Sequence, residues 1–268
     1  MSNTFNKDLP IDFTIGIDPG YATQGINVWD NRGAVPQLMM SKATVTDSDT
    51  DIWGRVEWQF QRVRDVLFWL GQRGNVPLNC LLILEEYRVS GGQKTSPGVI
   101  YNRAFYDALF RERLAKLFRF AITVHPSLVH LFSKIMVQKS VEVTIRKGEK
   151  KGQKKMQTRS VPDDVYDGSV PGVLRYVQKM WPDLVHPSVC EIESEFHQVE
   201  WLGKKPPKRT AKASWLAHAG DSMVMSLIGM TAFVYPGLMD RLNAKQRGKI
   251  EELKETYSFH EEATRTFR

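Results

Sequence analysis

The chain has 268 residues, of which 42% are hydrophobic and 25% charged, and its formal net charge is +7. This length allows one large domain or a core with a substantial insertion, and the composition is that of a soluble globular protein.

Two cysteines, Cys80 and Cys190, exclude a disulfide framework and a zinc pattern. Met1 to Pro10 is polar and no apolar run approaches the roughly 20 residues that span a bilayer, so we expect a cytoplasmic protein without a membrane partner. The basic charge favours an anionic partner such as nucleic acid.

The first predicted elements are three strands, at about 12–18, 24–30 and 35–46, joined by short turns as an antiparallel meander. Apolar residues at helical spacing then predict a helix over 52–72. We interpret its aromatic residues as core packing rather than a base-stacking platform. A continuous apolar run, Leu81–Leu84, predicts a strand at the centre of a sheet covered on both faces.

The second half of the chain is predicted to be mostly helical. After a helix over 99–118, strand Phe120–His125 closes a strand–helix–strand unit, and a short helix follows over Leu128–Met136. The alternation in 138–160 predicts a basic hairpin. Three further helices are expected over Val170–Met180, 213–235 and 241–257, whereas the acidic stretch Glu191–Glu200 shows no clear pattern.

Carboxylates stand at the ends of two predicted strands. Asp18 precedes the Pro19-Gly20 turn, and Glu85 follows Leu81–Leu84. If the two strands are neighbours, their carboxylates converge at one edge of the sheet. His218 and Asp221 lie three positions apart on the apolar helix, hence on one face. A packed imidazole and a satisfied core carboxylate would explain them separately, whereas a metal or a catalytic network explains both, because an isolated buried carboxylate is costly.

Basic residues gather in two places that could contact phosphates. Lys139 to Arg159 holds eight Lys or Arg against two Glu, a local charge of +6, and a second cluster surrounds 204–212. A Gly-Gly loop at 90–97 could approach a phosphate through its amides, although a plain linker fits equally well. Solvated surface is the alternative for the charge runs. The candidate nucleic-acid contacts are Lys94, Lys134, Lys150, Lys151, Lys154, Lys155, Lys204, Lys205, Lys208 and Arg209.

Three of these segments together resemble a known family. Gly16-Ile-Asp-Pro-Gly20 is similar to the opening motif of RuvC-type Holliday-junction resolvases, in the RNase H-like superfamily. Leu82-Ile-Leu-Glu85-Glu86 looks like the second acidic strand of that family, and Ala217-His-Ala-Gly-Asp221-Ser looks like its closing helix. The resemblance covers roughly 12–136 and 211–232. It implies an α/β fold with an RNase H-like mixed sheet, in which three antiparallel strands are followed by parallel strands, with helices on both faces.

The resemblance also implies an activity. Asp18, Glu85, His218 and Asp221 would bind two Mg²⁺ ions about 4 Å apart, for which Mn²⁺ could substitute, to hydrolyse phosphodiesters. His218 could instead transfer protons, since its pKa lies near neutrality. Family members act as homodimers that nick two strands of a four-way junction, so the helix over 99–118 is a candidate dimer face. Tyr87 and Arg88 would stack or wedge at the crossover of the branched DNA.

The chain departs from the compact family pattern by about 70 extra residues, 141–210, which we interpret as an inserted basic substrate-binding module. The expected division is a nuclease core over 1–140 and 211–236, that module, and a helical tail over 237–268. A small resolvase with its own insertion is what phage genomes often encode. Two alternatives stay open: an actin-like or sugar-kinase-fold ATPase, for which a second duplicated domain is lacking, and a non-catalytic nucleic-acid-binding protein of the same fold.

Overall fold

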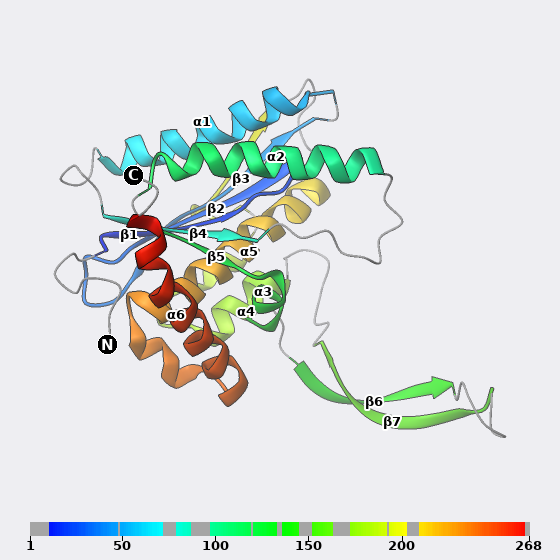
Figure 1. The fold of residues 1–268 in the computed structure, drawn as a ribbon. Helices are drawn as coiled ribbons and strands as arrows, with labels where there is room; N and C mark the ends of the chain where they lie inside the picture. Colours follow the sequence, from blue (N-terminus) through cyan, green and yellow to red (C-terminus); the bar gives the residue numbers. More distant parts are fainter. Residues whose placement is uncertain are drawn as a thin grey trace.

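The three N-terminal strands pair as an antiparallel meander in the computed structural model, as the sequence predicts (Figure 1). They are β1 (Phe13–Asp18), β2 (Thr23–Asp30) and β3 (Gln37–Thr46). The structure describes residues 11–47, 49–71, 79–86, 97–118, 120–132, 136–144, 152–162, 172–191, 193–202 and 209–265. Within these ranges, no helix is both long and apolar enough for a transmembrane span.

Parallel strands extend the meander on both sides. β4 (Cys80–Glu85) pairs with β1, and β5 (Phe120–Val124) pairs with β4, both in parallel. The strand order is β5-β4-β1-β2-β3-β8. The predicted fold class, an RNase H-like mixed sheet with helices on both faces, is therefore confirmed. β1 pairs with β4 on one side and β2 on the other, so Asp18 lies at the end of a central strand and not on an edge strand.

Two helices, α1 (Ile52–Gly71) and α2 (Pro97–Ala115), cover one face of the sheet (Figure 1). Buried residues of both helices form one hydrophobic cluster with β1, β2 and β4. Val56, Val63 and Leu70 lie in that cluster, and Phe60 and Trp69 pack against it, so the core-packing interpretation is confirmed for these two aromatic residues. It is wrong for Trp53, of which 57% is exposed.

The other face is covered mainly by α5 (Arg209–Phe233), the most apolar helix of the chain. Around it lie α3 (Pro126–Phe132), α4 (Gly172–Met180), α6 (Ala244–Arg265) and the short 3-10 helices η1 (Pro187–Cys190) and η2 (Pro236–Arg241). Their buried residues form a second cluster on this side of the sheet. The C-terminal helix, expected as a charged tail, therefore contributes Ile250 and Leu253 to the core.

The acidic stretch that had no predicted structure contains β8 (His197–Leu202), the sixth strand of the sheet. β8 pairs in parallel with β3, and its Glu200 joins the buried Lys42 and Arg62 in an ion-pair network. Leu174 and Trp181, from the same span, lie in the core. Residues 172–191 and 193–202 therefore include elements that pack with the sheet and its helices. Whether the span 141–210 binds substrate stays a prediction.

The basic hairpin is present and projects from the body of the protein (Figure 1). Its strands, β6 (Met136–Thr144) and β7 (Lys154–Pro162), pair with each other and, within the described ranges, with no other strand. The predicted helix over Leu128–Met136 was too long, since α3 ends at Phe132 and Met136 already belongs to β6.

Candidate active site

Two glycines allow α5 to cross the sheet closely enough to bring its side chains to Asp18. A Cβ atom on Gly16 of β1 would lie 2.2 Å from the carbonyl oxygen of Ser222, and one on Gly25 of β2 would lie 2.1 Å from that of His218. Both contacts are far shorter than any real Cβ tolerates. The Gly16-Ile-Asp motif therefore has two tasks: it places Asp18 at a strand end, and it makes room for the helix.

His218 and Asp18 form a direct hydrogen bond. The imidazole Nδ1 lies 2.6 Å from Oδ2 of Asp18, and Asp18 itself is only 7% exposed. Burial acts to lower the pKa of His218, but the hydrogen bond to Asp18 and the charges of the nearby carboxylates outweigh it, so this pKa is raised above 6.5. The imidazole is thereby favoured in its charged form, in which it partly neutralises the carboxylates.

Glu85 enters the same group from the end of β4. In the parallel register, Ile17 of β1 faces Leu84 of β4, so Asp18 and Glu85 follow at the same level of the sheet. Burial, and then the charges of Asp18 and Asp221, raise the pKa of Glu85 to about 8. A hydrogen bond between the Asp18 and Glu85 carboxyl groups acts in the same direction. The site thus holds more negative charge than His218 alone neutralises.

This donor set fits a hard divalent cation. Three carboxylates and one imidazole are ligands that Mg²⁺ or Mn²⁺ accepts. A cation would relieve the repulsion among the carboxylates, which adds to burial in raising the Glu85 pKa. Among the described residues, no three His, Cys, Asp or Glu side chains are already spaced as a ready-made metal cage. Cation binding would therefore have to draw the carboxyl groups, now hydrogen-bonded to each other, around the ion.

A cavity of about 370 Å³ opens over this group. Asp18, Glu85 and His218 line it together with Arg103 and Tyr106 of α2. These last two were not predicted from the sequence, because only the packing of α2 on the sheet turns them toward the strand ends. The sequence signal that could have grouped Arg103 with Tyr106 is their separation by three positions, which places both on one face of a helix.

The wall of the cavity is held by side chains from both helices of that face. The Tyr106 hydroxyl donates to Gln59 of α1, and Gln59 Nε2 donates to the Gly20 carbonyl at 3.3 Å, which braces the turn after Asp18. The guanidinium of Arg111 binds the Glu85 carbonyl and, at 2.6 Å, Asp107. The backbones that carry Asp18 and Glu85 are therefore tied to α1 and α2.

Three of the predicted nucleic-acid contacts lie among the described residues. Lys154 is exposed on β7, where it pairs with Glu142 of β6 at 2.9 Å, and it does not line this cavity. Lys155 lies on the same strand and Arg209 is the first residue of α5. The others lie outside the described residues: Tyr87, Arg88, Lys94, Lys134, Lys150, Lys151, Lys204, Lys205 and Lys208.

The sheet order defines an α/β protein with an RNase H-like mixed sheet, and the acidic group at its strand ends is a candidate metal-binding site. Similar solved structures include Thermus thermophilus RuvC, at 15% identity and a TM-score of 0.40, covering 81% of this chain and 96% of that one. The yeast mitochondrial Holliday junction resolvase Ydc2 is 9% identical, with a TM-score of 0.36 and coverage of 93% and 84%. An Aquifex aeolicus member of the Ppx/GppA family is 12% identical, with a TM-score of 0.32 and coverage of 65% and 60%.

No protein-family model and no curated protein matches this chain. At the identities and TM-scores of the solved structures, the likeness says nothing of function or of individual residues.

Proposed function

We propose that this protein is a metal-dependent, structure-selective DNA endonuclease that resolves four-way junctions or related branched DNA by paired nicks. One observation supports this most strongly: Asp18, Glu85, His218 and Asp221 come from β1, β4 and α5 and form one electrostatically linked group. The three family-like motifs predict this grouping. A buried carboxyl group whose pKa is raised to about 8 by burial and by two facing carboxylates is typical of a functional site.

In this proposal, Asp18, Glu85, Asp221 and His218 hold two Mg²⁺ ions. The ions would supply an activated water and charge stabilisation at the departing oxygen. The hydrogen bond to Asp18 fixes the His218 ring through Nδ1, so Nε2 could carry a proton or, after losing that proton, bind an ion. Arg103 lines the same cavity with a positive charge and would orient a non-bridging phosphate oxygen.

Paired nicks require two active sites, so we propose a homodimer with α2 as the contact face. The exposed Tyr101, and Phe105 stacked on it, lie on this helix. The basic hairpin would bind a DNA arm, because it projects from the body and carries Lys139 on β6 and Lys154 and Lys155 on β7.

A cleavage assay tests the function directly. Four-way junction, flap, fork and linear duplex are compared in Mg²⁺, Mn²⁺ and EDTA, with ATP hydrolysis measured in parallel. We expect metal-dependent cleavage of branched DNA, and we expect Asp18→Asn and Asp221→Asn to reduce it by about 100-fold or more while junction binding survives. Wild-type rates in both variants would refute the mechanism. ATP hydrolysis without DNA would instead favour the kinase-fold alternative, and binding without any cleavage would favour the non-catalytic one.

A further inference from the structure

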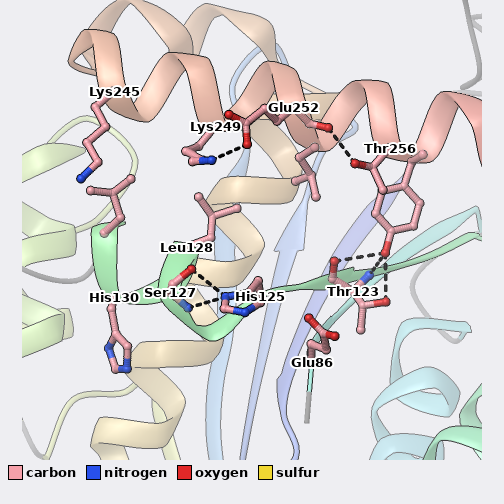
Figure 2. A pocket seen from close by; sticks show the side chains of 13 residues that line it. Glu86, Thr123, His125, Ser127, Leu128, His130, Lys245, Lys249, Glu252 and Thr256 are labelled. Carbon is pink, nitrogen blue, oxygen red and sulfur yellow. Dashed lines mark hydrogen bonds and ion pairs between the residues drawn. The ribbon is translucent and has the colours of Figure 1, made fainter. Parts of the chain in front are cut away.

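A second cavity, of about 830 Å³, lies between the end of β5, α3 and one face of α6 (Figure 2). Its volume is within the range of ordinary ligand sites. Side chains with hydroxyl, imidazole, ammonium and carboxylate groups line it. They are Glu86, Thr123, His125, Ser127, His130, Lys245, Lys249, Glu252, Thr256 and Tyr257, with three leucines.

One face of α6 supplies the basic side of the cavity. Lys245, Lys249, Glu252 and Thr256 recur at helical spacing and all line it. Lys249 pairs with Glu252, whereas Lys245 has no ion-pair partner within the described residues. Figure 2 shows the Lys245 side chain and Glu86 at opposite sides of the cavity. The side formed by the start of α6 therefore suits an anion.

The start of α6 is rigidly placed. Asn243 and Gln246 cap it reciprocally, with Gln246 N donating to Asn243 Oδ1 at 3.0 Å and Asn243 N donating to Gln246 Oε1 at 3.1 Å. Gln246 Nε2 also donates to the Leu131 carbonyl of α3 at 3.3 Å. Because the buried Ile250 holds the next turn, the lysines are carried on a fixed frame.

The floor of the cavity is also preorganised. The backbone N–H of Ser127 donates to His125 Nδ1 at 3.0 Å, and the Ser127 hydroxyl lies 2.6 Å from the same nitrogen. Since Nδ1 accepts, Nε2 carries the ring proton and remains a donor for a ligand. The Tyr257 hydroxyl, 2.9 Å from Thr123 Oγ1, closes the far side.

The two cavities are neighbours along the chain, because Glu85 lines the first and Glu86 lines the second. Each strand of a DNA substrate carries one phosphate per nucleotide, so a site for a further phosphate fits the same ligand. We propose that the cavity between α3 and α6 binds a backbone phosphate of the DNA substrate, through Lys245, Lys249 and His125. This inference rests on the proposed function for its ligand.

The salt dependence of junction binding in EDTA tests the proposal, because each phosphate contact adds a fixed increment to the slope. We expect Lys245→Gln and Lys249→Gln each to reduce the slope by about 0.7–0.9. Lys254→Gln is the matched control, since it lies on the same helix outside the cavity and pairs with Glu251; its slope should not change. Unchanged slopes in all three variants, with junction binding intact, would overturn the proposal and leave the proposed nuclease function standing.

Imidazole NMR signals locate the ligand and identify its source. Inorganic phosphate and a junction oligonucleotide should both shift the signals of His125 and His130 while leaving those of the half-buried His197, which does not line the cavity, unmoved. Lys245→Gln should weaken both effects. A response to inorganic phosphate but not to DNA would overturn the assignment to a DNA phosphate. If the lysine variants change the slope but the wild type cleaves no DNA, the phosphate site stands and the nuclease proposal fails.

Discussion

Nδ1 of His218 lies 2.6 Å from Oδ2 of Asp18, although 200 residues separate them in the chain. The contact joins the first strand to the closing helix across the sheet. Since the pKa of His218 is raised by this partner and its neighbours, the pair has the character of an ion pair at neutral pH. Removing either member leaves the other in a half-buried, strongly charged site.

His218 can be tested as a metal ligand by exchanging one ligand type for another. We expect His218→Asp to keep most Mg²⁺-dependent cleavage, because a carboxylate also binds Mg²⁺, and His218→Ala to lose it. In EDTA, His218→Asp should be less stable than wild type, since it adds a fourth carboxylate to an uncompensated group. Loss of cleavage in His218→Asp with metal binding intact by calorimetry would assign His218 to proton transfer instead.

Glu85→Gln should make the metal-free protein more stable at high pH and should abolish its stabilisation by Mg²⁺. The pKa of Glu85 is raised from 4.5 to about 8, so the folded state retains a proton that the unfolded chain has lost, and stability falls as pH rises through that window. In EDTA we therefore expect Glu85→Gln to raise Tm at about pH 9 and to have little effect at about pH 5. Mg²⁺ should raise the Tm of wild type but not that of this variant. If the variant lowered the Tm equally at both pH values, burial and the neighbouring carboxylates would not be what destabilises ionised Glu85.

Gly16→Ala should destabilise the protein by about 1–3 kcal/mol or more, since the new methyl group meets the Ser222 carbonyl and forces α5 away from β1. Cleavage should fall as well, because the same shift moves His218 and Asp221. Urea unfolding measures the first effect. Gly248→Ala is the control: this glycine is exposed within α6, nothing lies within 4 Å of its Cβ position, and the exchange should stabilise by about 0.5–1 kcal/mol. Equal behaviour of the two variants would show that α5 does not need the close approach.

Glu200→Gln tests how β8 is held on the sheet. Lys42, 6% exposed, and Arg62 both pair with Glu200, the latter at 2.8 Å. Leaving the Lys42 charge without its partner should cost about 2 kcal/mol or more. Burial acts to raise the Glu200 pKa, but the hydrogen bonds from Lys42 and Arg62 outweigh it and lower that pKa, so the contribution is present at neutral pH and is lost as pH falls.

The matched control for this network is Glu251→Gln, which breaks an exposed pair with Lys254 and should cost well under 1 kcal/mol. Denaturant unfolding at about pH 7 and pH 3 should show the difference between the two variants shrinking in acid. A Glu200→Gln protein as stable as the control at pH 7 would contradict the role of the network.

The basic hairpin can be tested by charge alone. Replacing Lys150, Lys151, Lys154 and Lys155 by Gln should weaken junction binding and flatten its salt dependence, because phosphate contacts and counterion release are lost together. Fluorescence polarisation over a salt series measures both. The strands should still pair, since β6 and β7 are held by backbone hydrogen bonds. An unchanged slope would exclude the hairpin from the DNA interface.

The sequence alone determined the elements whose signals are local. The meander, the strand ending at Glu85 and the apolar helix carrying His218 and Asp221 all follow from periodicity and turn residues, and all are present. The convergence of Asp18 with Glu85 could also be anticipated, because neighbouring parallel strands bring their carboxyl ends to one edge.

What only the tertiary structure decided depends on pairing between distant segments. The sequence of β8 has only weak strand signals. It forms a strand because its backbone pairs with the edge of β3 and its Glu200 forms an ion pair with the buried Lys42. Arg103 lines the active-site cavity, and Lys245 lines the cavity between α3 and α6, only because of the way in which α2 and α6 pack. Hydrophobic periodicity says which face of a helix is buried, but not which strand end or neighbouring helix that face will meet.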